Sequence, residues 1–341
     1  MSRGIGEFQP VQEFIPEWAA VLIALLTQLG DGWFLITLLA ILYWKRKKEQ
    51  DQILLVGGIL ACGIGLYRGL KYHFRLPRPD EPLLDPELLP WLIRPLYEAT
   101  AFHSGYGFPS GHATMATIVY FGLATVLATG PRRLRFLLAG TLVTIIGFTR
   151  VALGVHYLVD IVVGVFLGVL LLYIAFRLLD RVSFERGTIL FAVAILLNLF
   201  YYYTSDGNTE SVIMIGVTLG VFGGWQLILL ARTLVGVNRP SEGFQSIGLR
   251  GSLAGGSLVP LVVVLEMFPI GPSQPYSTAG IVGLAVAAIV IIPVARYSAR
   301  VQRIVAGLLF WVRAIGDGLI LLVRPSTWRH IGHELWNRYR R

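Results

Sequence analysis

One short stretch combines a fixed cation, an imidazole and a carboxylate beside a strongly apolar run. Its polar residues are Arg150, His156 and Asp160. On a helix, His156 and Asp160 would share one face, so the carboxylate can hold one imidazole nitrogen and leave the other free as a nucleophile or base. Arg150 offers a planar fork that suits phosphate oxygens. The stretch therefore predicts phosphate chemistry, with a snorkelling arginine and a self-satisfied His–Asp pair as the structural alternative.

Two further motifs lie upstream of this stretch. Their residues are Lys71 and Arg78 in the pattern K-x6-R-P, and Pro109, Ser110, Gly111 and His112 in the pattern P-S-G-H. Ser110 and Gly111 are expected to open a helix, where free backbone N–H groups and the helix dipole favour an anion. Each motif alone is a weak signal, and their joint occurrence is a strong one.

In their order along the chain, the three motifs resemble those of the type 2 phosphatidic acid phosphatase (PAP2) family, a relative of glucose-6-phosphatase and the vanadium haloperoxidases. The family pattern is K-x6-R-P, P-S-G-H and S-R-x5-H-x3-D. This chain departs from it only at Thr149, where the family has serine. A hydroxyl group is retained there, so the change bears only on fine contacts to a phosphate.

The resemblance implies a role for each motif residue. His156 is expected to be the nucleophile that forms a phosphohistidine, Asp160 to orient it, and His112 to protonate the leaving group. The remaining motif residues are expected to bind the phosphate: Lys71, Arg78, Ser110, Gly111 and Arg150. The resemblance implies no metal ion and no cofactor, and the other histidines have no neighbours at metal-ligand spacing.

The composition is that of an integral membrane protein. Hydrophobic residues make up 55% of the 341 positions and charged residues 14%, and the mean hydropathy is +0.67. Runs such as 53–70 and 158–176 are close to the length of about 20 residues that crosses a bilayer. A single cysteine, Cys62, excludes an internal disulfide and a cysteine metal cluster. The net charge of +9 comes mostly from clusters between apolar runs, which is a topology signal rather than a nucleic-acid surface.

Basic clusters at residues 45–48 and 131–135 predict cytoplasmic loops. The apolar run 18–44 is too long for one upright span, so residues 16–29 are expected to form an interfacial or tilted helix before a short span. The later spans then alternate so that all three motifs reach the opposite face. We therefore expect a multi-pass protein of the cell membrane with an extracytoplasmic active site.

Two regions are expected: residues 1–186 as a PAP2-like catalytic membrane domain, and residues 187–341 as additional transmembrane helices with a basic tail. Candidate spans in the second region are residues 188–203, 211–232, 252–268 and 278–294. Residues 301–323 carry charges in mid-run, so they are expected to lie along the membrane surface or to enter it only in part. The fold class is all-α, a polytopic membrane helix bundle with a haloperoxidase-like core.

The outer loop at residues 80–108 is long for a connection and rich in leucine, so it is expected to be functional. It is either a membrane-dipping lid that guides a lipid tail or a loop packed over the helix ends.

The sequence predicts a metal-independent phosphatase that acts on a lipid phosphate or polyprenyl diphosphate among membrane lipids, and not on nucleic acid. A phosphotransferase that passes the phosphoryl group to a lipid or sugar acceptor would have the same motifs. A lipid transporter or flippase built on residues 187–341 is the alternative from a different class, although few polar residues fall inside the later runs.

Overall fold

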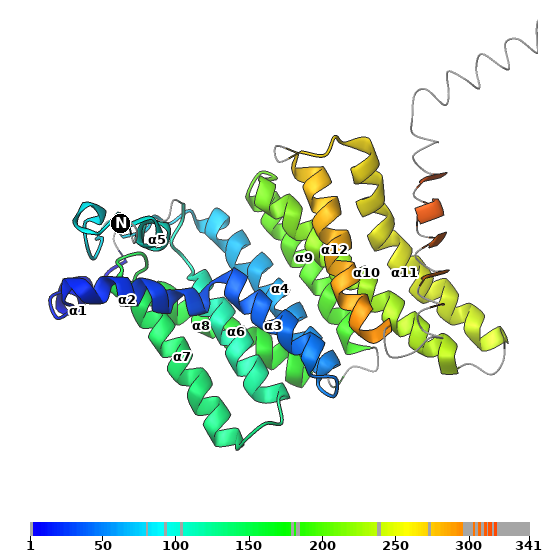
Figure 1. Ribbon diagram of the computed structural model, residues 1–341, viewed down its shortest axis with the longest axis horizontal. Helices are drawn as coiled ribbons and strands as arrows, with labels where there is room; N and C mark the ends of the chain where they lie inside the picture. The colour runs from blue at the N-terminus through cyan, green and yellow to red at the C-terminus, as the bar shows by residue number, and fades with distance from the viewer. Residues whose placement is uncertain are drawn as a thin grey trace, which may run out of the picture. The chain divides into compact units, whose positions relative to one another are not determined.

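The computed structural model describes residues 3–79, 81–91, 94–102, 105–178, 181, 185–236, 240–271 and 274–295, and single residues between 303 and 318. These residues form helices and no strand (Figure 1), which confirms the all-α prediction. The helices are α1 (Phe8–Gln12), α2 (Glu17–Thr27), η1 (Gln28–Gly30), α3 (Gly32–Lys45), α4 (Gln50–Phe74), η2 (Pro86–Leu88), α5 (Arg94–Ala101), α6 (Gly111–Val126), α7 (Arg132–Ala152), α8 (Leu158–Tyr173), η3 (Ile174–Leu178), α9 (Arg186–Thr204), α10 (Thr209–Gly236), α11 (Pro240–Met267) and α12 (Pro275–Ala295).

The chain divides into two compact units. The first ends at Asp206 and holds α1 to α9, and the second begins at Gly207 and holds α10 to α12. This division falls one helix later than the expected domain boundary after residue 186, because α9 packs along α4. Buried Asn198 on α9 donates from Nδ2 to the carbonyl oxygen of Ala61 on α4 at 3.1 Å.

Seven of the described helices are long and apolar enough to cross a membrane: α4, α7, α8, α9, α10, α11 and α12. Helices α2 and α3 form a further candidate, bent by 49° between Gly30 and Gly32. This bend corresponds to the tilted helix and short span that the sequence predicted. The protein is therefore a multi-pass membrane protein.

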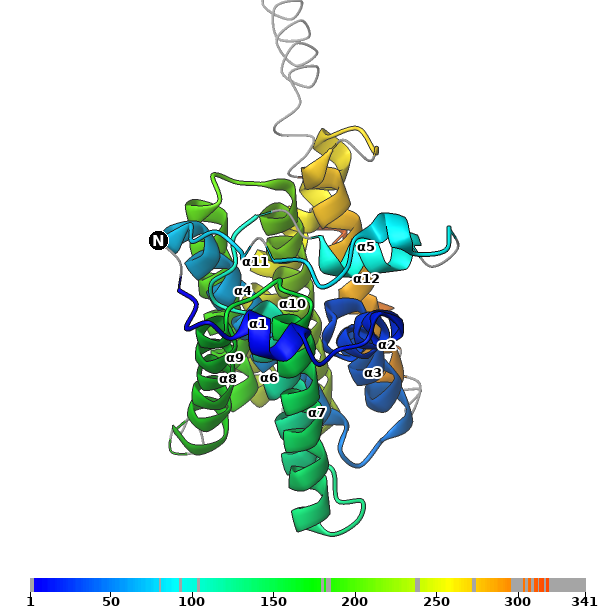
Figure 2. The ribbon, with the colours of Figure 1, turned by 90° about the vertical axis from the view of Figure 1, so that its left-hand side faces the viewer.

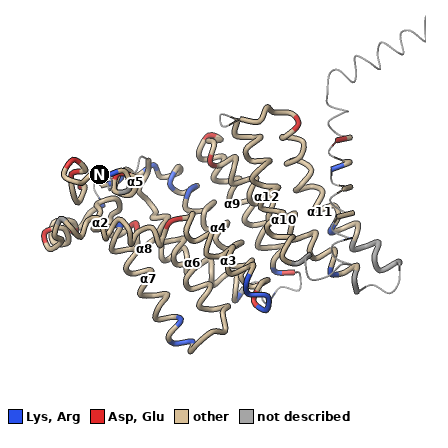
Figure 3. The backbone as a smooth tube through the Cα atoms, in the orientation of Figure 1, with Lys and Arg blue, Asp and Glu red and all other residues tan. Residues whose placement is uncertain are grey.

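Two basic clusters lie at one end of the first unit. Figure 3 shows the cluster after α3 and the arginines that open α7 at the same end of that unit. The three motifs are at the other helix ends: the last turn of α4, the first turn of α6, and the junction of α7 with α8. The assignment of the basic end to the cytoplasm stays a prediction.

Glycine residues bring α6 and α8 close together. A Cβ atom on Gly164 of α8 would lie 2.6 Å from the carbonyl oxygen of Ser110, and one on Gly168 would lie 2.7 Å from Cβ of Thr117. Larger residues at these two positions would therefore separate the helices. Because Ser110 caps α6 and Asp160 lies in the first turn of α8, this packing fixes the distance between two of the motifs.

Part of the loop after α4 packs on the helix ends. Tyr97 on α5 is fully buried, and its hydroxyl accepts from the N–H of Leu84 at 2.9 Å and donates to the carbonyl oxygen of Leu84 at 3.2 Å. Tyr97 belongs to an apolar cluster with Ala20, Ile23, Ala24, Ala101, Ala152, Leu153 and Val155. Leu88 and Trp91 are instead exposed, at 67% and 82%. The loop thus combines a packed side with an exposed apolar edge.

The second unit is a bundle of α10, α11 and α12, and all three coincide with predicted spans. Its apolar core contains Leu227, Ala231, Ala254, Leu258, Leu261, Ala287 and Ile291. The predictions for residues 301–323 and for the basic tail fall almost entirely outside the described residues.

Candidate active site

His156 lies in the turn between α7 and α8, and Asp160 lies in the first turn of α8. Nδ1 of His156 is 3.3 Å from Oδ2 of Asp160, and both side chains are at most 1% exposed. The turn requires a glycine, because Gly154 has a φ of +68° and a Cβ atom there would lie 1.7 Å from the carbonyl oxygen of Glu81. The structure therefore holds the predicted His–Asp pair at a tight, buried turn, with Asp160 on α8 and His156 just before this helix.

The second nitrogen of His156 faces a cation. Nη1 of Arg78 lies 3.1 Å from Nε2 of His156, and it also donates to the carbonyl oxygen of Val155 at 2.9 Å. A guanidinium can only donate, so Nε2 accepts and the imidazole proton resides on Nδ1, toward Asp160. In this tautomer Nε2 carries the free electron pair that a nucleophile needs.

Arg150, in the last turn of α7, is 1% exposed. Its Nη1 donates to Oγ1 of Thr27 at 3.0 Å, while Nε and Nη2 are buried without a hydrogen-bond partner. Nε of Arg78 is likewise buried without a partner. Unpaired buried N–H groups are rare and costly, and three of them on two guanidinium groups suit an anion that accepts from all three.

Lys71, in the last turn of α4, adds a third cation to this set. Its Nζ donates to the carbonyl oxygen of Tyr106 at 2.9 Å. An ammonium group has three donor hydrogens, so this bond does not exhaust its capacity.

Ser110 caps α6 as the sequence predicted. Its Oγ accepts from the N–H of Ala113 at 3.4 Å, and its own N–H donates to the carbonyl oxygen of Asp160 at 3.0 Å. Gly111 was expected to allow close approach of a phosphate. In the structure the space beside it is taken by Tyr67, whose ring would lie 2.6 Å from a Cβ atom on Gly111. Phosphate binding by Ser110 and Gly111 stays a prediction.

His112 has a carboxylate partner of its own. Nε2 of His112 lies 3.0 Å from Oδ1 of Asp31, at the bend between η1 and α3. The site thus holds two histidine–carboxylate pairs. His156 with Asp160 contains the expected nucleophile, and His112 with Asp31 contains the expected proton donor. In the part of the chain that the structure describes, no three His, Cys, Asp or Glu side chains converge as metal ligands.

The environment of His156 favours its neutral form. Burial lowers the pKa of His156 well below 6.5, and the positive charges of Lys71, Arg78 and Arg150 lower it further. Burial also lowers the pKa of Arg78 to about 10, against the opposing effect of Asp160. At neutral pH the site therefore contains an uncharged imidazole beside a charged guanidinium.

Three residues at the site were not singled out from the sequence: Arg3, Thr27 and Asp31. Nε and Nη2 of Arg3 donate to the two carboxylate oxygens of Asp160 at 3.1 and 3.2 Å. Asp31 did carry a signal, because a carboxylate inside an apolar run is costly unless it has a function. Arg3 and Thr27 carried none, since nothing in their spacing relates them to the motifs. Thr149, the one departure from the pattern, donates from Oγ1 to the carbonyl oxygen of Ile146 at 2.7 Å.

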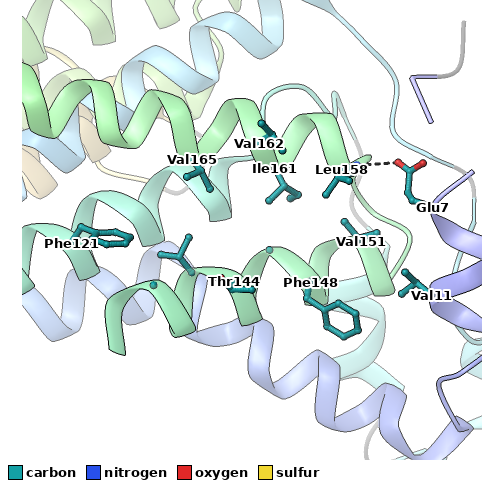
Figure 4. A pocket seen from close by; sticks show the side chains of 13 residues that line it. Glu7, Val11, Phe121, Thr144, Phe148, Val151, Leu158, Ile161, Val162 and Val165 are labelled. Carbon is teal, nitrogen blue, oxygen red and sulfur yellow. Dashed lines mark hydrogen bonds between the residues drawn. The ribbon is translucent and has the colours of Figure 1, made fainter. Parts of the chain in front are cut away.

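An apolar groove of about 550 Å³ runs between α7 and α8. Figure 4 shows its side chains, with Leu158 and Glu7 at one end and Phe121 at the other. The lining residues are Glu7, Val11, Phe121, Gly140, Val143, Thr144, Gly147, Phe148, Val151, Leu158, Ile161, Val162 and Val165. Leu158, at one end of the groove, follows His156 by two residues in the sequence, but the buried side chain of His156 is not among the lining residues.

Known proteins resemble part of this chain. Phosphatidylglycerophosphatase B from Bacillus subtilis is 27% identical over 168 residues, which are 46% of this chain and 73% of that protein. Decaprenylphosphoryl-5-phosphoribose phosphatase from Mycobacterium tuberculosis is 30% identical over 139 residues, 40% of this chain and 66% of that protein. Sphingosine-1-phosphate phosphatase 2 from Mus musculus is 28% identical over 215 residues, 56% of this chain and 55% of that protein.

Among solved structures, the transmembrane PAP2-type phosphatidylglycerolphosphate phosphatase from Bacillus subtilis matches 52% of this chain and 85% of its own length. Its sequence identity is 24% and its TM-score is 0.40. The family model of the PAP2 superfamily matches residues 52–184, a segment that contains every predicted motif residue. This segment of the chain therefore matches the PAP2 superfamily.

Proposed function

We propose that this protein is a metal-independent phosphatase that removes a phosphate group from a lipid phosphate or polyprenyl diphosphate through a phosphohistidine. The observation that carries the proposal is a buried neutral His156 that Arg78 contacts and whose pKa is lowered by the charges of Arg78 and Arg150, two guanidinium groups with buried N–H groups that lack a partner. Buried positive charge of this kind stabilises the negative charge that builds on phosphate oxygens in the transition state.

The reaction proceeds in two steps. Nε2 of His156 bonds to phosphorus while the bond from phosphorus to the leaving oxygen breaks, and His112 gives that oxygen its proton. In the second step water attacks the phosphohistidine, His112 takes a proton from the water, and the phosphorus–nitrogen bond breaks. Asp160 holds the Nδ1 proton throughout, so Nε2 stays directed at phosphorus. The products are the dephosphorylated lipid and inorganic phosphate.

The groove between α7 and α8 supports a lipid substrate. It is lined almost wholly by apolar side chains, and Leu158 at one end follows His156 by two residues in the sequence. A hydrocarbon chain in this groove would have to extend its phosphate group beyond Leu158 to reach the buried cations. Phosphatidylglycerophosphatase B and decaprenylphosphoryl-5-phosphoribose phosphatase are both named for lipids that carry a phosphate group.

The test is phosphate release by the purified protein in detergent from phosphatidic acid, phosphatidylglycerophosphate and farnesyl diphosphate, with EDTA present throughout. We expect release from at least one of them, abolished by His156→Asn and retained by His73→Asn. His73 is an exposed histidine in the last turn of α4, and it serves as the matched control. Absence of release from all three, or a requirement for added magnesium, would contradict the proposal. If release falls and a phosphorylated product appears on adding an acceptor alcohol, the protein is instead a phosphotransferase.

We place the active site on the extracytoplasmic face of the cell membrane, because the basic clusters lie at the opposite helix ends. The test is labelling of single cysteines in intact cells by a membrane-impermeant reagent, in a Cys62→Ala background. Glu87→Cys in the outer loop should be labelled and Lys47→Cys should not. The reverse pattern would invert the topology.

A further inference from the structure

The N-terminal segment places an arginine on the carboxylate that orients the proposed nucleophile. Nε of Arg3 donates to Oδ1 of Asp160 at 3.1 Å, and Nη2 donates to Oδ2 at 3.2 Å. Two bonds from one guanidinium to one carboxylate form the bidentate arrangement, which is the strongest and most directional form of this ion pair. Asp160 is fully buried and the Arg3 side chain is 14% exposed, so water screens the pair little.

Further contacts fix Arg3 in this position. Its Nη2 also donates to the carbonyl oxygen of Pro77 at 2.9 Å, one residue before Arg78. Its guanidinium lies 4.8 Å from the centre of the Tyr157 ring, within the range of a cation–π interaction. The arginine therefore joins the loop that carries the K-x6-R-P motif to the turn that carries His156.

The residues after Arg3 bind the same turn. A Cβ atom on Gly4 would lie 3.1 Å from the ring of Tyr157, so the backbone packs closely against that ring. Oε1 of Glu7 accepts from the N–H of Leu158 at 3.0 Å, a bond that Figure 4 shows and that satisfies the first N–H of α8. Residues 3–7, which we call the N-terminal strap, thus hold the start of α8 at two points. Figure 2 shows α1, which follows the strap, lying across the end of α7 at which α8 begins.

The two oxygens of Asp160 have different partners. Oδ2 accepts from the N–H of Tyr157 at 3.1 Å, lies 3.3 Å from Nδ1 of His156 and also accepts from Arg3, whereas Oδ1 accepts from Nε of Arg3. Loss of Arg3 would leave Oδ1 without this bond and allow the carboxylate to rotate about its last torsion. Because His156 is held through Oδ2, the imidazole would then turn away from its reactive direction.

We propose that Arg3 is a positioning residue for the phosphatase reaction, which clamps Asp160 and thereby fixes the direction of Nε2 of His156. This inference rests on the proposed function of the site. Nη1 of Arg3 is buried without a hydrogen-bond partner, as are atoms of Arg78 and Arg150. In the role proposed here Arg3 acts through Asp160 rather than on the phosphate, so its loss lowers kcat and leaves KM nearly unchanged. Misplacement of a reacting group by about 1 Å costs about 100-fold in rate, so we expect Arg3→Gln to lower kcat by about 10- to 100-fold.

The first experiment measures kcat and KM of the full chain in detergent with the lipid phosphate that the wild-type protein hydrolyses. Arg3→Lys should recover part of the rate, because an ammonium keeps the charge but cannot make two bonds in the fixed fork of a guanidinium. Arg46→Gln, an exposed arginine after α3, is the matched control and should leave both constants unchanged. A rise in KM with unchanged kcat for Arg3→Gln would show that Arg3 binds substrate and would overturn the inference.

The second experiment repeats Arg3→Gln in an Asp160→Asn background, with phosphate release followed over long incubations. A residue that works only through Asp160 has little left to act on there, so the added loss should be less than about 2-fold. An equal loss in both backgrounds would overturn the inference and assign Arg3 to general stability, which the melting temperature of Arg3→Gln checks directly. A wild-type protein without phosphatase activity would instead contradict the proposed function.

Discussion

The two units of this protein bury polar groups in different ways. In the first unit, Arg150, His156 and Asp160 are each at most 1% exposed, and they converge with other charged groups on one point at the helix ends. In the second unit the buried polar side chains of the described residues are uncharged, and most of them donate to a backbone carbonyl oxygen three or four residues earlier in the chain. Ser257 and Thr218, for example, donate to carbonyl oxygens three and four residues before them.

Close packing at glycine, in contrast, occurs in both units, as between α6 and α8 of the first unit. Gly216 and Gly220 on α10 approach the backbone of α12 so closely that Cβ atoms would lie 2.3 Å from the carbonyl oxygen of Ala279 and 2.0 Å from that of Gly283. Small residues at such spacing allow membrane helices to pack closely through van der Waals contact. The buried polar groups of the second unit therefore serve helix packing. The first unit instead keeps buried charges, whose free-energy cost points to a ligand or a reaction.

The largest expected effect is on the two histidines of the first unit. His156→Asn removes the nucleophile, so phosphate release should fall by several powers of ten for every substrate. His112→Asn removes a proton donor, a group worth about 10²- to 10⁴-fold in rate. Its loss should be smallest for p-nitrophenyl phosphate, whose leaving group needs no proton. The measurement is kcat for each variant with a lipid phosphate and with p-nitrophenyl phosphate.

An unequal response to the leaving group distinguishes the two roles. If His156→Asn were the variant rescued by the nitrophenyl leaving group, the assignments of nucleophile and proton donor would have to be exchanged. Equal effects of both variants on both substrates would remove the distinction altogether.

The next largest effect is expected on the stability of the second unit. Gly220→Val places a side chain against the backbone of α12, and overpacking of this kind costs about 1–3 kcal/mol or more. We expect a lower melting temperature in detergent, with phosphatase activity per folded molecule unchanged at low temperature. Gly256→Val is the matched control, because a Cβ atom there meets nothing within 4 Å.

Valine favours a helix more than glycine does, so the control should keep or slightly raise the melting temperature. A folded Gly220→Val protein without phosphatase activity would contradict this distinction between the units, because it would show that the second unit takes part in the reaction.

The smallest effect is a shift in the titration of one histidine. Because burial and three cations lower the pKa of His156, its imidazole should stay neutral as the pH falls through 6.5 and become protonated only at a clearly lower pH. The nucleophile is thus retained in mild acid rather than lost. Nitrogen-15 NMR of histidine-labelled protein would test this, with the signal assigned by its absence in His156→Asn. Titration at or above pH 6.5 would show that the cations do not surround His156 as described.

The motifs predicted the centre of the site because their chemistry is local in sequence. The spacing of His156 and Asp160 and the position of Ser110 at a helix start each restrict geometry within a few residues. The basic clusters predicted how the spans alternate across the membrane. This alternation led us to expect the helix ends with the motif cations on one face. The number and limits of most spans followed from hydropathy alone, because hydropathy is also a local property of the sequence.

Contacts between distant segments could not be predicted in this way. Arg3 reaches Asp160 across 157 positions, and no periodicity relates the two. Tyr67 fills the space beside Gly111, so the reason for that glycine is a neighbouring helix and not only a ligand. The placement of α9 with the first unit likewise depends on how closely its residues fit against α4, which hydropathy does not report.

The most direct test of the central claim is the location of the phosphoryl group on the protein during turnover. The wild-type protein would be mixed with its lipid phosphate, quenched in alkali to preserve phosphohistidine, digested and analysed by mass spectrometry. We predict a phosphoryl group on His156, in a peptide that is unmodified in the His156→Asn protein. Phosphorylation of His112, or turnover without any phosphohistidine, would contradict the account.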